Sequence, residues 1–195
     1  MIKAIIFDCF GVLVQGSLEQ FIDSHLAEKN MELVKRAHEL NDQCSLGLIS
    51  YEEQIAGFSE MSGLSIAQVH ELMDVNPRNK QLLDYISSEL KPKYKIGFLS
   101  NAGEDWLDEL FLKEDLSLFD DTVLSYAVGL AKPDFRIFEL SAKRLNVKPE
   151  ECVFVDDIER YCISAQDLGM KAIVYRTFSQ MRHELEEILS ADMND

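Results

Sequence analysis

Positively charged residues are scarce in this sequence. Its 195 residues include 19 lysines and arginines against 35 aspartates and glutamates, which gives a formal net charge of −16 at pH 7. A surface with this charge repels a polyanion, so we expect no binding to DNA or long RNA. A small phosphate ester is compatible with it, because a metal ion and local cations can reverse the potential inside a pocket.

Long apolar runs and paired cysteines are also missing. No apolar stretch approaches the ~20 residues that a membrane-spanning helix needs. Met1 leads into a short apolar run that ends at Asp8, which is unlike a secretory signal peptide. The four cysteines have no CxxC spacing, which favours buried, reduced thiols. We therefore expect a cytoplasmic protein with no membrane partner.

Several motifs of common enzyme classes do not occur. The sequence contains no GxSxG, Walker A or GxGxxG pattern. Serine hydrolases, P-loop enzymes and dinucleotide-binding Rossmann proteins therefore have no support. What is present is the profile of a globular protein, with 47% hydrophobic and 28% charged residues.

Five short apolar runs predict buried strands, at residues 2–7, 96–99, 122–124, 152–155 and 172–175. All but the third are rich in β-branched or aromatic residues, as expected of parallel strands that are covered on both faces. Amphipathic patterns predict helices between and after them, at residues 79–90, 134–145, 159–168 and 179–189. This alternation predicts an α/β fold, a Rossmann-like doubly wound parallel sheet.

One connection is too long for this alternation. Between the first predicted strand and position 77 the pattern predicts only helices, at residues 18–28, 32–42, 51–61 and 66–73. A connection of this length is rarely a loop. We therefore predict two domains: an α/β core of residues 1–14 and 77–195, and a small all-helical cap at residues 15–76.

Polar residues follow the predicted strands. Ligands of open α/β sheets bind beyond the carboxyl ends of the strands. Three carboxylates, a hydroxyl, an amide and an ammonium group follow four of these strands: Asp8, Ser100, Asn101, Lys132, Asp156 and Asp157. Taken singly, each could cap a helix or be solvated, but together they form a set that helix capping does not require.

This set predicts a chemistry. Converging carboxylates repel one another unless a cation neutralises them, and oxygen ligands beside a phosphate favour Mg²⁺. An aspartate can attack phosphorus to give an aspartyl phosphate. Lys132 and the Ser100 hydroxyl can then stabilise the charge of the phosphoryl oxygens. We therefore predict a magnesium-dependent hydrolase that acts on a small phosphorylated metabolite, with Asp8 as the nucleophile.

Four segments resemble, in order, the four sequence motifs of the haloacid dehalogenase (HAD) superfamily: residues 7–13 (FDCFGVL), 99–101 (LSN), 131–134 (AKPD) and 154–157 (FVDD). The helical insert resembles the C1 cap of that superfamily. Within it, residues 48–53 (LISYEE) resemble a segment of the epoxide-hydrolase-phosphatase-like branch. The resemblance covers nearly the whole chain and implies a HAD-type core.

The resemblance also implies a magnesium site next to a phosphoryl site. The implied Mg²⁺ ligands are Asp8, the backbone carbonyl of Phe10, Asp157 and, through water, Asp156. The implied phosphoryl-binding residues are Ser100, Asn101 and Lys132. The implied catalytic residues are Asp8, Ser100 and Lys132.

Position 10 departs from the family pattern. Family phosphatases usually carry an aspartate there, which protonates the leaving group and then activates water, whereas this chain has Phe10. General acid–base catalysis contributes about 10²–10⁴-fold to a rate. His25, Tyr51 and Glu52 of the predicted cap are candidate replacement donors, although packing or surface roles are common for such residues.

Two alternative functions follow from Phe10. A degenerate protein could bind Mg²⁺ and phosphate without forming a covalent intermediate. An aromatic residue at this position also resembles the 2-haloacid dehalogenases, which attack carbon and need no metal. The paired acids Asp156 and Asp157 favour a metal site, and therefore favour phosphoester hydrolysis over dehalogenation.

Overall fold

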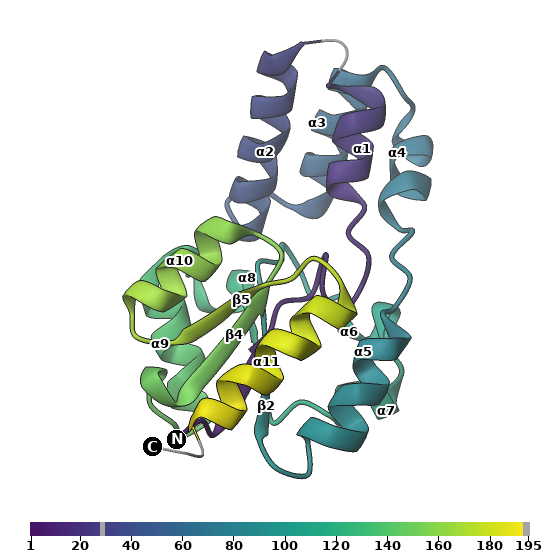
Figure 1. Ribbon diagram of the computed structural model, residues 1–195. Helices are drawn as coiled ribbons and strands as arrows, with labels where there is room; N and C mark the ends of the chain where they lie inside the picture. The colour runs from purple at the N-terminus through teal and green to yellow at the C-terminus, as the bar shows by residue number, and fades with distance from the viewer. Residues whose placement is uncertain (28–29, 193–195) are drawn as a thin grey trace.

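The computed structural model describes residues 1–27 and 30–192. Its centre is a five-stranded parallel sheet with the strand order β3-β2-β1-β4-β5 (Figure 1). The strands are β1 (Ala4–Phe7), β2 (Lys95–Ser100), β3 (Asp121–Leu124), β4 (Cys152–Asp156) and β5 (Lys171–Val174). All five predicted strands are present within two residues of their predicted ends, so the α/β prediction is confirmed.

The register aligns the carboxyl ends of the central strands. Phe7, the last residue of β1, pairs with Phe98 of β2 and with Val155 of β4. Residues that follow these strands therefore emerge at one edge of the sheet, which we call the carboxyl edge. Asp8 and Ser100 lie at this edge, and Asp156 ends β4 there.

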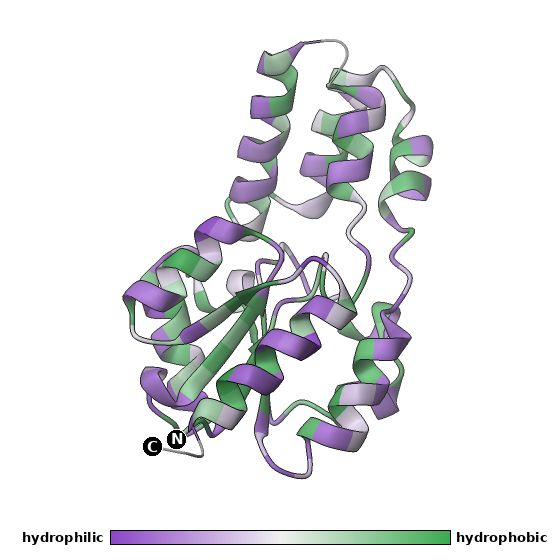
Figure 2. Ribbon diagram, viewed as in Figure 1, coloured by the Kyte–Doolittle hydropathy of each residue, from purple (hydrophilic) through white to green (hydrophobic). Residues whose placement is uncertain are grey.

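The two faces of the sheet pack against different helices. Alternate residues of β1 belong to separate hydrophobic clusters, Ile5 and Phe7 to one and Ala4 and Ile6 to the other. The first face is covered by α5 (Lys80–Tyr85) and α11 (Phe178–Asp192), and the second by α9 (Phe135–Arg144) and α10 (Glu159–Asp167). Figure 2 shows apolar strands at the centre and polar residues on the outward faces of the helices.

The remaining core elements are short. The predicted helix at 79–90 is divided into α5 and a π-helical turn, Ile86–Leu90. Four short helical elements were not predicted: α6 (Leu107–Leu110), α7 (Lys113–Leu116), α8 (Ser125–Val128) and the 3₁₀ turn Pro149–Glu151. A helix of one turn contains too few residues to show a period of 3.6.

The long connection after β1 is helical, as predicted. It contains α1 (Leu18–His25), α2 (Met31–Ser45), α3 (Tyr51–Ser62) and α4 (Ile66–Met73), which stand together above the carboxyl edge (Figure 1). The first of these ends at His25, and the predicted end at position 28 lies outside the described residues. Reciprocal side-chain to backbone hydrogen bonds cap α3 at Ser50 and α4 at Ser65.

These four helices have a hydrophobic cluster of their own. Its buried members are Phe21, Ile22, Leu26, Ala37, Ile55, Phe58, Met61 and Val69. The two linkers to the core are paired, because the Gln15 N–H donates to the Pro77 carbonyl at 3.0 Å and the Asn79 N–H to the Leu13 carbonyl at 2.8 Å. Both observations support the predicted domain boundaries, which stay a proposal.

Within residues 1–27 and 30–192, none of the helices combines the length and the apolar character that crossing a membrane requires.

Candidate active site

A buried ammonium group joins two carboxylates at the carboxyl edge. The Lys132 Nζ lies 2.6 Å from Asp8 Oδ1 and 2.6 Å from Asp156 Oδ2. All three residues are buried, and the Asp156 side chain is 0% exposed. Burying unpaired charges costs several kcal/mol each, so the mutual pairing is what makes this arrangement tolerable.

A third carboxylate, that of Asp157, lies beside this pair. Oxygens of Asp8, Asp156 and Asp157 all lie within 4.8 Å of one another. Asp157 Oδ1 is buried and has no hydrogen-bond partner among the described residues. Its backbone carbonyl accepts a 2.7 Å hydrogen bond from Arg176 Nη1, which holds the main chain at this point.

Gly11 allows the Asp157 carboxylate to come this close. A Cβ atom at position 11 would lie 2.2 Å from Asp157 Oδ2, and the φ angle of Gly11 is +84°. Glycine is therefore needed there both for its backbone conformation and for space. Gly11 was not among the predicted site residues, although its position three residues after Asp8 is visible in the sequence.

The donor atoms of this cluster fit Mg²⁺. Asp8 Oδ2 and Asp157 Oδ1 make no hydrogen bond to any described residue, and none of the described hydrogen bonds ends on the Phe10 carbonyl. Mg²⁺ prefers such oxygen ligands. Asp156 differs, because Lys132 contacts its Oδ2 and the Ile158 N–H donates to its Oδ1 at 2.8 Å. The predicted water-mediated role of Asp156 stays a prediction.

Two carboxyl groups of the cluster, those of Asp8 and Asp157, have raised pKa values. Burial and the Asp156 charge raise the pKa of Asp8 to about 8, against a smaller lowering by Lys132. Burial and Asp156 likewise raise the pKa of Asp157 to about 6. Burial alone would lower the pKa of Lys132, but the Asp156 and Asp8 carboxylates outweigh it and raise that pKa. The site thus lacks positive charge, which a divalent cation would supply.

Ser100 and Asn101 lie next to Lys132, but their side chains differ in what they contact. The Ser100 side chain is buried at the end of β2, and its hydroxyl makes a long 3.4 Å contact with the Asn101 carbonyl. The Asn101 amide, by contrast, donates to the Lys132 carbonyl at 3.0 Å and accepts from the Lys132 N–H at 2.8 Å. Asn101 therefore holds the loop that carries Lys132.

Phe10 contributes an aromatic contact and no acid. Its half-buried ring lies 4.9 Å from that of Trp106 in an edge-to-face arrangement, and Trp106 also packs near Phe98.

The candidate donors of the helical insertion have other contacts. His25 Nδ1 lies 3.3 Å from the Phe21 carbonyl, and the His25 ring stacks on Phe21. The Tyr51 hydroxyl lies 3.4 Å from Asp74 Oδ1. Among the described residues, no hydrogen bond or ion pair links these two side chains or Glu52 to Asp8 or Lys132.

The prediction missed Tyr161, which lies against Lys132. Its ring centroid is 5.1 Å from the Lys132 Nζ, and its hydroxyl accepts a 3.0 Å hydrogen bond from Arg160 Nη2. A tyrosine four residues after Asp157, near the start of a helix at the carboxyl edge, was a usable signal. Arg160 is also 4.0 Å from Asp42 of α2, the one ion pair between the insertion and the core within the described ranges.

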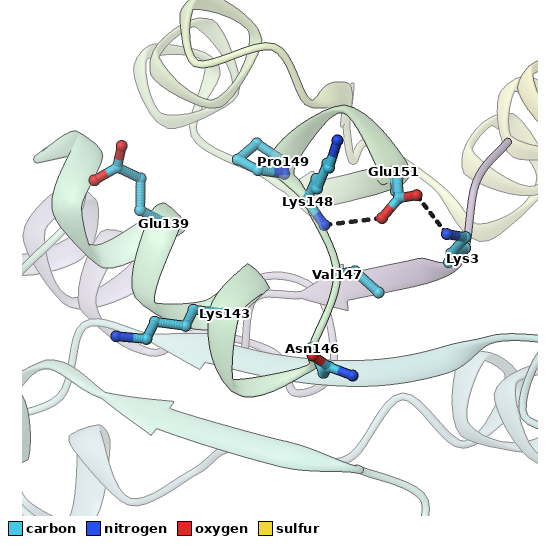
Figure 3. Close-up of a pocket in the computed structure, with 8 residues that line it drawn as sticks. All are labelled: Lys3, Glu139, Lys143, Asn146, Val147, Lys148, Pro149 and Glu151. Atoms are coloured by element: carbon cyan, nitrogen blue, oxygen red, sulfur yellow. Dashed lines mark hydrogen bonds and ion pairs between the residues drawn. The ribbon is translucent and has the colours of Figure 1, made fainter.

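A groove lies at the opposite end of the sheet from the buried cluster. A hollow of about 570 Å³ is lined by Lys3, Glu139, Lys143, Asn146, Val147, Lys148, Pro149 and Glu151 (Figure 3). Lys3 precedes β1 and Glu151 precedes β4, so the groove lies at the amino ends of the strands. These two residues pair with each other at 2.5 Å, and most of the other side chains are exposed. We assign the groove no chemistry.

Comparison with known proteins identifies the family. The family model of haloacid dehalogenase-like hydrolases matches residues 2–169. The chain therefore belongs to the haloacid dehalogenase-like hydrolases, and the resemblance drawn from the four motifs is confirmed.

Relatives that align over the full length are described as phosphatases. The chain is 29% identical to D-ribitol-5-phosphate phosphatase of Bacteroides thetaiotaomicron, with 98% of this chain and 100% of the relative aligned. It is 25% identical to the putative phosphatase YhcW of Bacillus subtilis, covering 99% and 95%. The match to pig bifunctional epoxide hydrolase 2 is 36% identical but covers 38% of this chain and 14% of that enzyme. Against several larger relatives the chain thus spans a quarter or less of their length.

Solved structures agree with this assignment. A HAD family enzyme from Bacteroides thetaiotaomicron, solved with magnesium and inorganic phosphate, superimposes with a TM-score of 0.68 at 26% identity, covering 91% of this chain and 96% of that chain. A 2-haloacid dehalogenase from Pseudomonas syringae superimposes with a TM-score of 0.57 at 19% identity, covering 90% and 86%, which shows a shared fold alone.

Proposed function

We propose that the chain is a Mg²⁺-dependent phosphomonoesterase that hydrolyses a small phosphorylated metabolite through an aspartyl phosphate at Asp8. The observation that carries this proposal is the buried cluster itself, in which one lysine pairs with Asp8 while the adjacent Asp157 keeps a carboxylate oxygen that no described residue contacts by a hydrogen bond. Three carboxylates that share one lysine at the carboxyl edge favour a site that is completed by a cation and an anionic substrate.

The proposed metal ligands are Asp8, Asp157 and the Phe10 carbonyl. Bound Mg²⁺ would offset the charge of the carboxylates and polarise a phosphoryl oxygen. Asp156 would hold Lys132 in place and contact the ion through water. The magnesium and phosphate reported for a structural relative from Bacteroides thetaiotaomicron support this assignment.

The proposed reaction has two steps. An Asp8 carboxylate oxygen attacks phosphorus, and the bond from phosphorus to the leaving oxygen breaks. Water then attacks the aspartyl phosphate, which releases inorganic phosphate and restores Asp8. In both steps Lys132 and the Ser100 hydroxyl donate to the phosphoryl oxygens, and Asn101 holds the main chain of Lys132.

Phe10 limits which leaving groups can depart. Its ring packs on Trp106 and offers no proton, so an alkoxide would leave unprotonated. We therefore expect an aryl phosphate to be hydrolysed about 10²-fold faster than an alkyl phosphate such as glycerol 3-phosphate. Equal rates for the two would indicate a proton donor that approaches from the helical insertion.

Phosphate release from p-nitrophenyl phosphate, with Mg²⁺ or with EDTA, tests the proposal. Its leaving group is a weak base, so the assay probes the nucleophile and the metal without needing an acid. We expect turnover that requires Mg²⁺ and that falls at least ~10³-fold in Asp8→Asn, because the covalent step is lost. Wild-type rates in that variant would refute the mechanism.

A protein that only binds phosphate is the second candidate, and the missing acid at Phe10 favours it. It predicts that the folded wild-type protein binds Mg²⁺ and inorganic phosphate in calorimetry while neither a phosphoenzyme nor product is detected. Metal-independent halide release from a 2-haloacid would instead support the dehalogenase alternative.

A further inference from the structure

The Lys132 ammonium group has no unused donor. It has three N–H bonds, and three oxygens lie around it: Asp8 Oδ1 and Asp156 Oδ2 at 2.6 Å and the Leu99 carbonyl at 3.4 Å. In the proposed function Lys132 also binds a phosphoryl oxygen. At least one N–H must then turn away from a present partner, and Asp8 is the partner that reacts.

Hydrogen bonds alone would hold the ammonium group weakly during that exchange. Each N–H that turns toward the phosphoryl group removes one of the contacts that fix the nitrogen. A restraint that uses no N–H would keep it in place, and an aromatic face is such a restraint, because the ring quadrupole attracts the whole cation.

Two aromatic rings flank the ammonium group. The Lys132 Nζ lies 5.1 Å from the ring centroid of Tyr161 and 5.5 Å from that of Phe154. Phe154 belongs to β4 and is packed edge-to-face against Phe138 in the core. Tyr161 projects from α10 and is only 5% exposed. Both rings lie in a desolvated setting, where a cation–π contact is strongest.

The Tyr161 ring is itself held at its polar end. Its hydroxyl accepts a 3.0 Å hydrogen bond from Arg160 Nη2 and lies 3.5 Å from Asn101 Nδ2. Asn101 in turn is hydrogen-bonded to both backbone groups of Lys132. The main chain and the ammonium group of Lys132 thus connect to the same small network.

We propose that Tyr161 is a positioning residue for Lys132: its ring keeps the ammonium group in place while the N–H bonds exchange Asp8 for the phosphoryl group. This inference rests on the proposed function for the role of Lys132. It makes Tyr161 contribute to phosphate affinity through the face of its ring, with a lesser contribution from the hydroxyl.

Binding of orthovanadate and inorganic phosphate in the presence of Mg²⁺ tests this role by calorimetry, without requiring turnover. We expect Tyr161→Leu to weaken the affinity for both anions by about 10- to 30-fold. Tyr161→Phe keeps the ring and should stay within about threefold of wild type. The affinity for Mg²⁺ alone should change little in either variant.

Tyr85→Leu is a matched control. Tyr85 is also a buried tyrosine (8% exposed) with a cation over its ring, since Arg182 lies 5.2 Å from its centroid, but it belongs to α5 and contacts Phe178. Tyr85→Leu should lower the melting temperature about as much as Tyr161→Leu does, and it should leave the anion affinity unchanged. Tyr161→Met fills the site without a π face and replaces the leucine variant if that variant does not fold.

The outcomes separate this inference from the proposed function. Wild-type anion affinity in the leucine and methionine variants would overturn it, and so would a loss in Tyr161→Phe as large as in Tyr161→Leu. Absence of p-nitrophenyl phosphate turnover in the wild type would refute the proposed function, while weaker anion binding in Tyr161→Leu would still support the positioning role.

Discussion

The two ends of the sheet carry charge in different ways. At the carboxyl edge, Lys132 is buried in contact with the buried Asp8 and Asp156, and one carboxylate oxygen of Asp157 has no hydrogen-bond partner in the described part of the chain. At the amino end, a groove of about 570 Å³ is lined by three lysines and two glutamates, most of them exposed (Figure 3). The charged groups of the groove are therefore less costly to maintain than the buried ones of the carboxyl edge.

This difference distinguishes charged groups that bind a ligand or react from charged groups of an ordinary surface. Exposed lysines and glutamates cost little free energy to maintain and can occur on any surface. Buried carboxylates whose pKa values are raised cost free energy, and a fold retains them where they bind something or react. The volume of a groove indicates space for a ligand, whereas the burial of charge indicates a requirement for one.

Removing the Asp157 carboxylate should lower the activity more than a change at Gly11 or in the groove. Asp157→Ala deletes a proposed metal ligand, and the Lewis-acid contribution of a metal ion amounts to several kcal/mol. We expect the Mg²⁺-dependent rate on p-nitrophenyl phosphate to fall by about 10³-fold. Calorimetry should show weaker Mg²⁺ binding with the melting temperature kept or raised. Unchanged Mg²⁺ affinity would place the ion elsewhere.

A methyl group at Gly11 should disturb the same carboxylate indirectly. Gly11→Ala places a Cβ 2.2 Å from Asp157 Oδ2, so the side chain must move. We expect Mg²⁺ affinity and activity to fall by about 10- to 100-fold, as when groups that support metal ligands are altered. Gly63→Ala is the control, because Gly63 has a similar φ of +77° and nothing within 4 Å of its added Cβ. Equal losses in both variants would attribute the effect to backbone strain.

The sequence was sufficient to predict the carboxyl edge but not its internal contacts. Apolar runs located the strands, and parallel strands bring their carboxyl ends together. The proximity of Asp8 and Asp156 could therefore be predicted from their positions at the ends of two strands. The contact between the Asn101 amide and the backbone of Lys132, 31 positions later, did not follow. It depends on the path of the loop after β3, which no periodic pattern encodes.

The aromatic contacts of the site could not be predicted from the sequence either. Phe10 was recognised as a departure from the family pattern, but its packing on Trp106 depends on the conformation of two loops. Tyr161 lies on a helix that was predicted correctly, yet its contact with Lys132 joins elements far apart in the chain. Local pattern therefore predicted where elements begin, while long-range side-chain contacts required the structure.

The charge cluster should make stability depend on pH. The folded pKa values of Asp8 (about 8) and Asp157 (about 6) exceed the ordinary value near 4, so the folded state holds protons that the unfolded chain releases. Without metal, the free energy of unfolding should therefore fall as pH rises from about 4 through about 8. Asp8→Asn removes part of this dependence.

Thermal unfolding in EDTA at pH 5 and pH 8 measures the effect. We expect the melting temperature of Asp8→Asn relative to wild type to rise between these pH values by about 2–4 °C, which corresponds to roughly 1 kcal/mol in a chain of this size. Added Mg²⁺ should stabilise the wild type most at pH 8. A difference that stays constant with pH would indicate that Asp8 is already ionised at pH 5.

A substitution in the groove should have the smallest effect on activity and on stability. Lys143 is exposed, belongs to no ion pair between described residues and lines the groove at the end of the sheet opposite Asp8 (Figure 3). Lys143→Ala should leave the rate on p-nitrophenyl phosphate within twofold and the free energy of unfolding within about 0.5 kcal/mol, as expected for an exposed position. A larger loss of activity would mean that the amino end of the sheet communicates with the buried cluster. The burial of charge would then be insufficient to delimit the functional part of the fold.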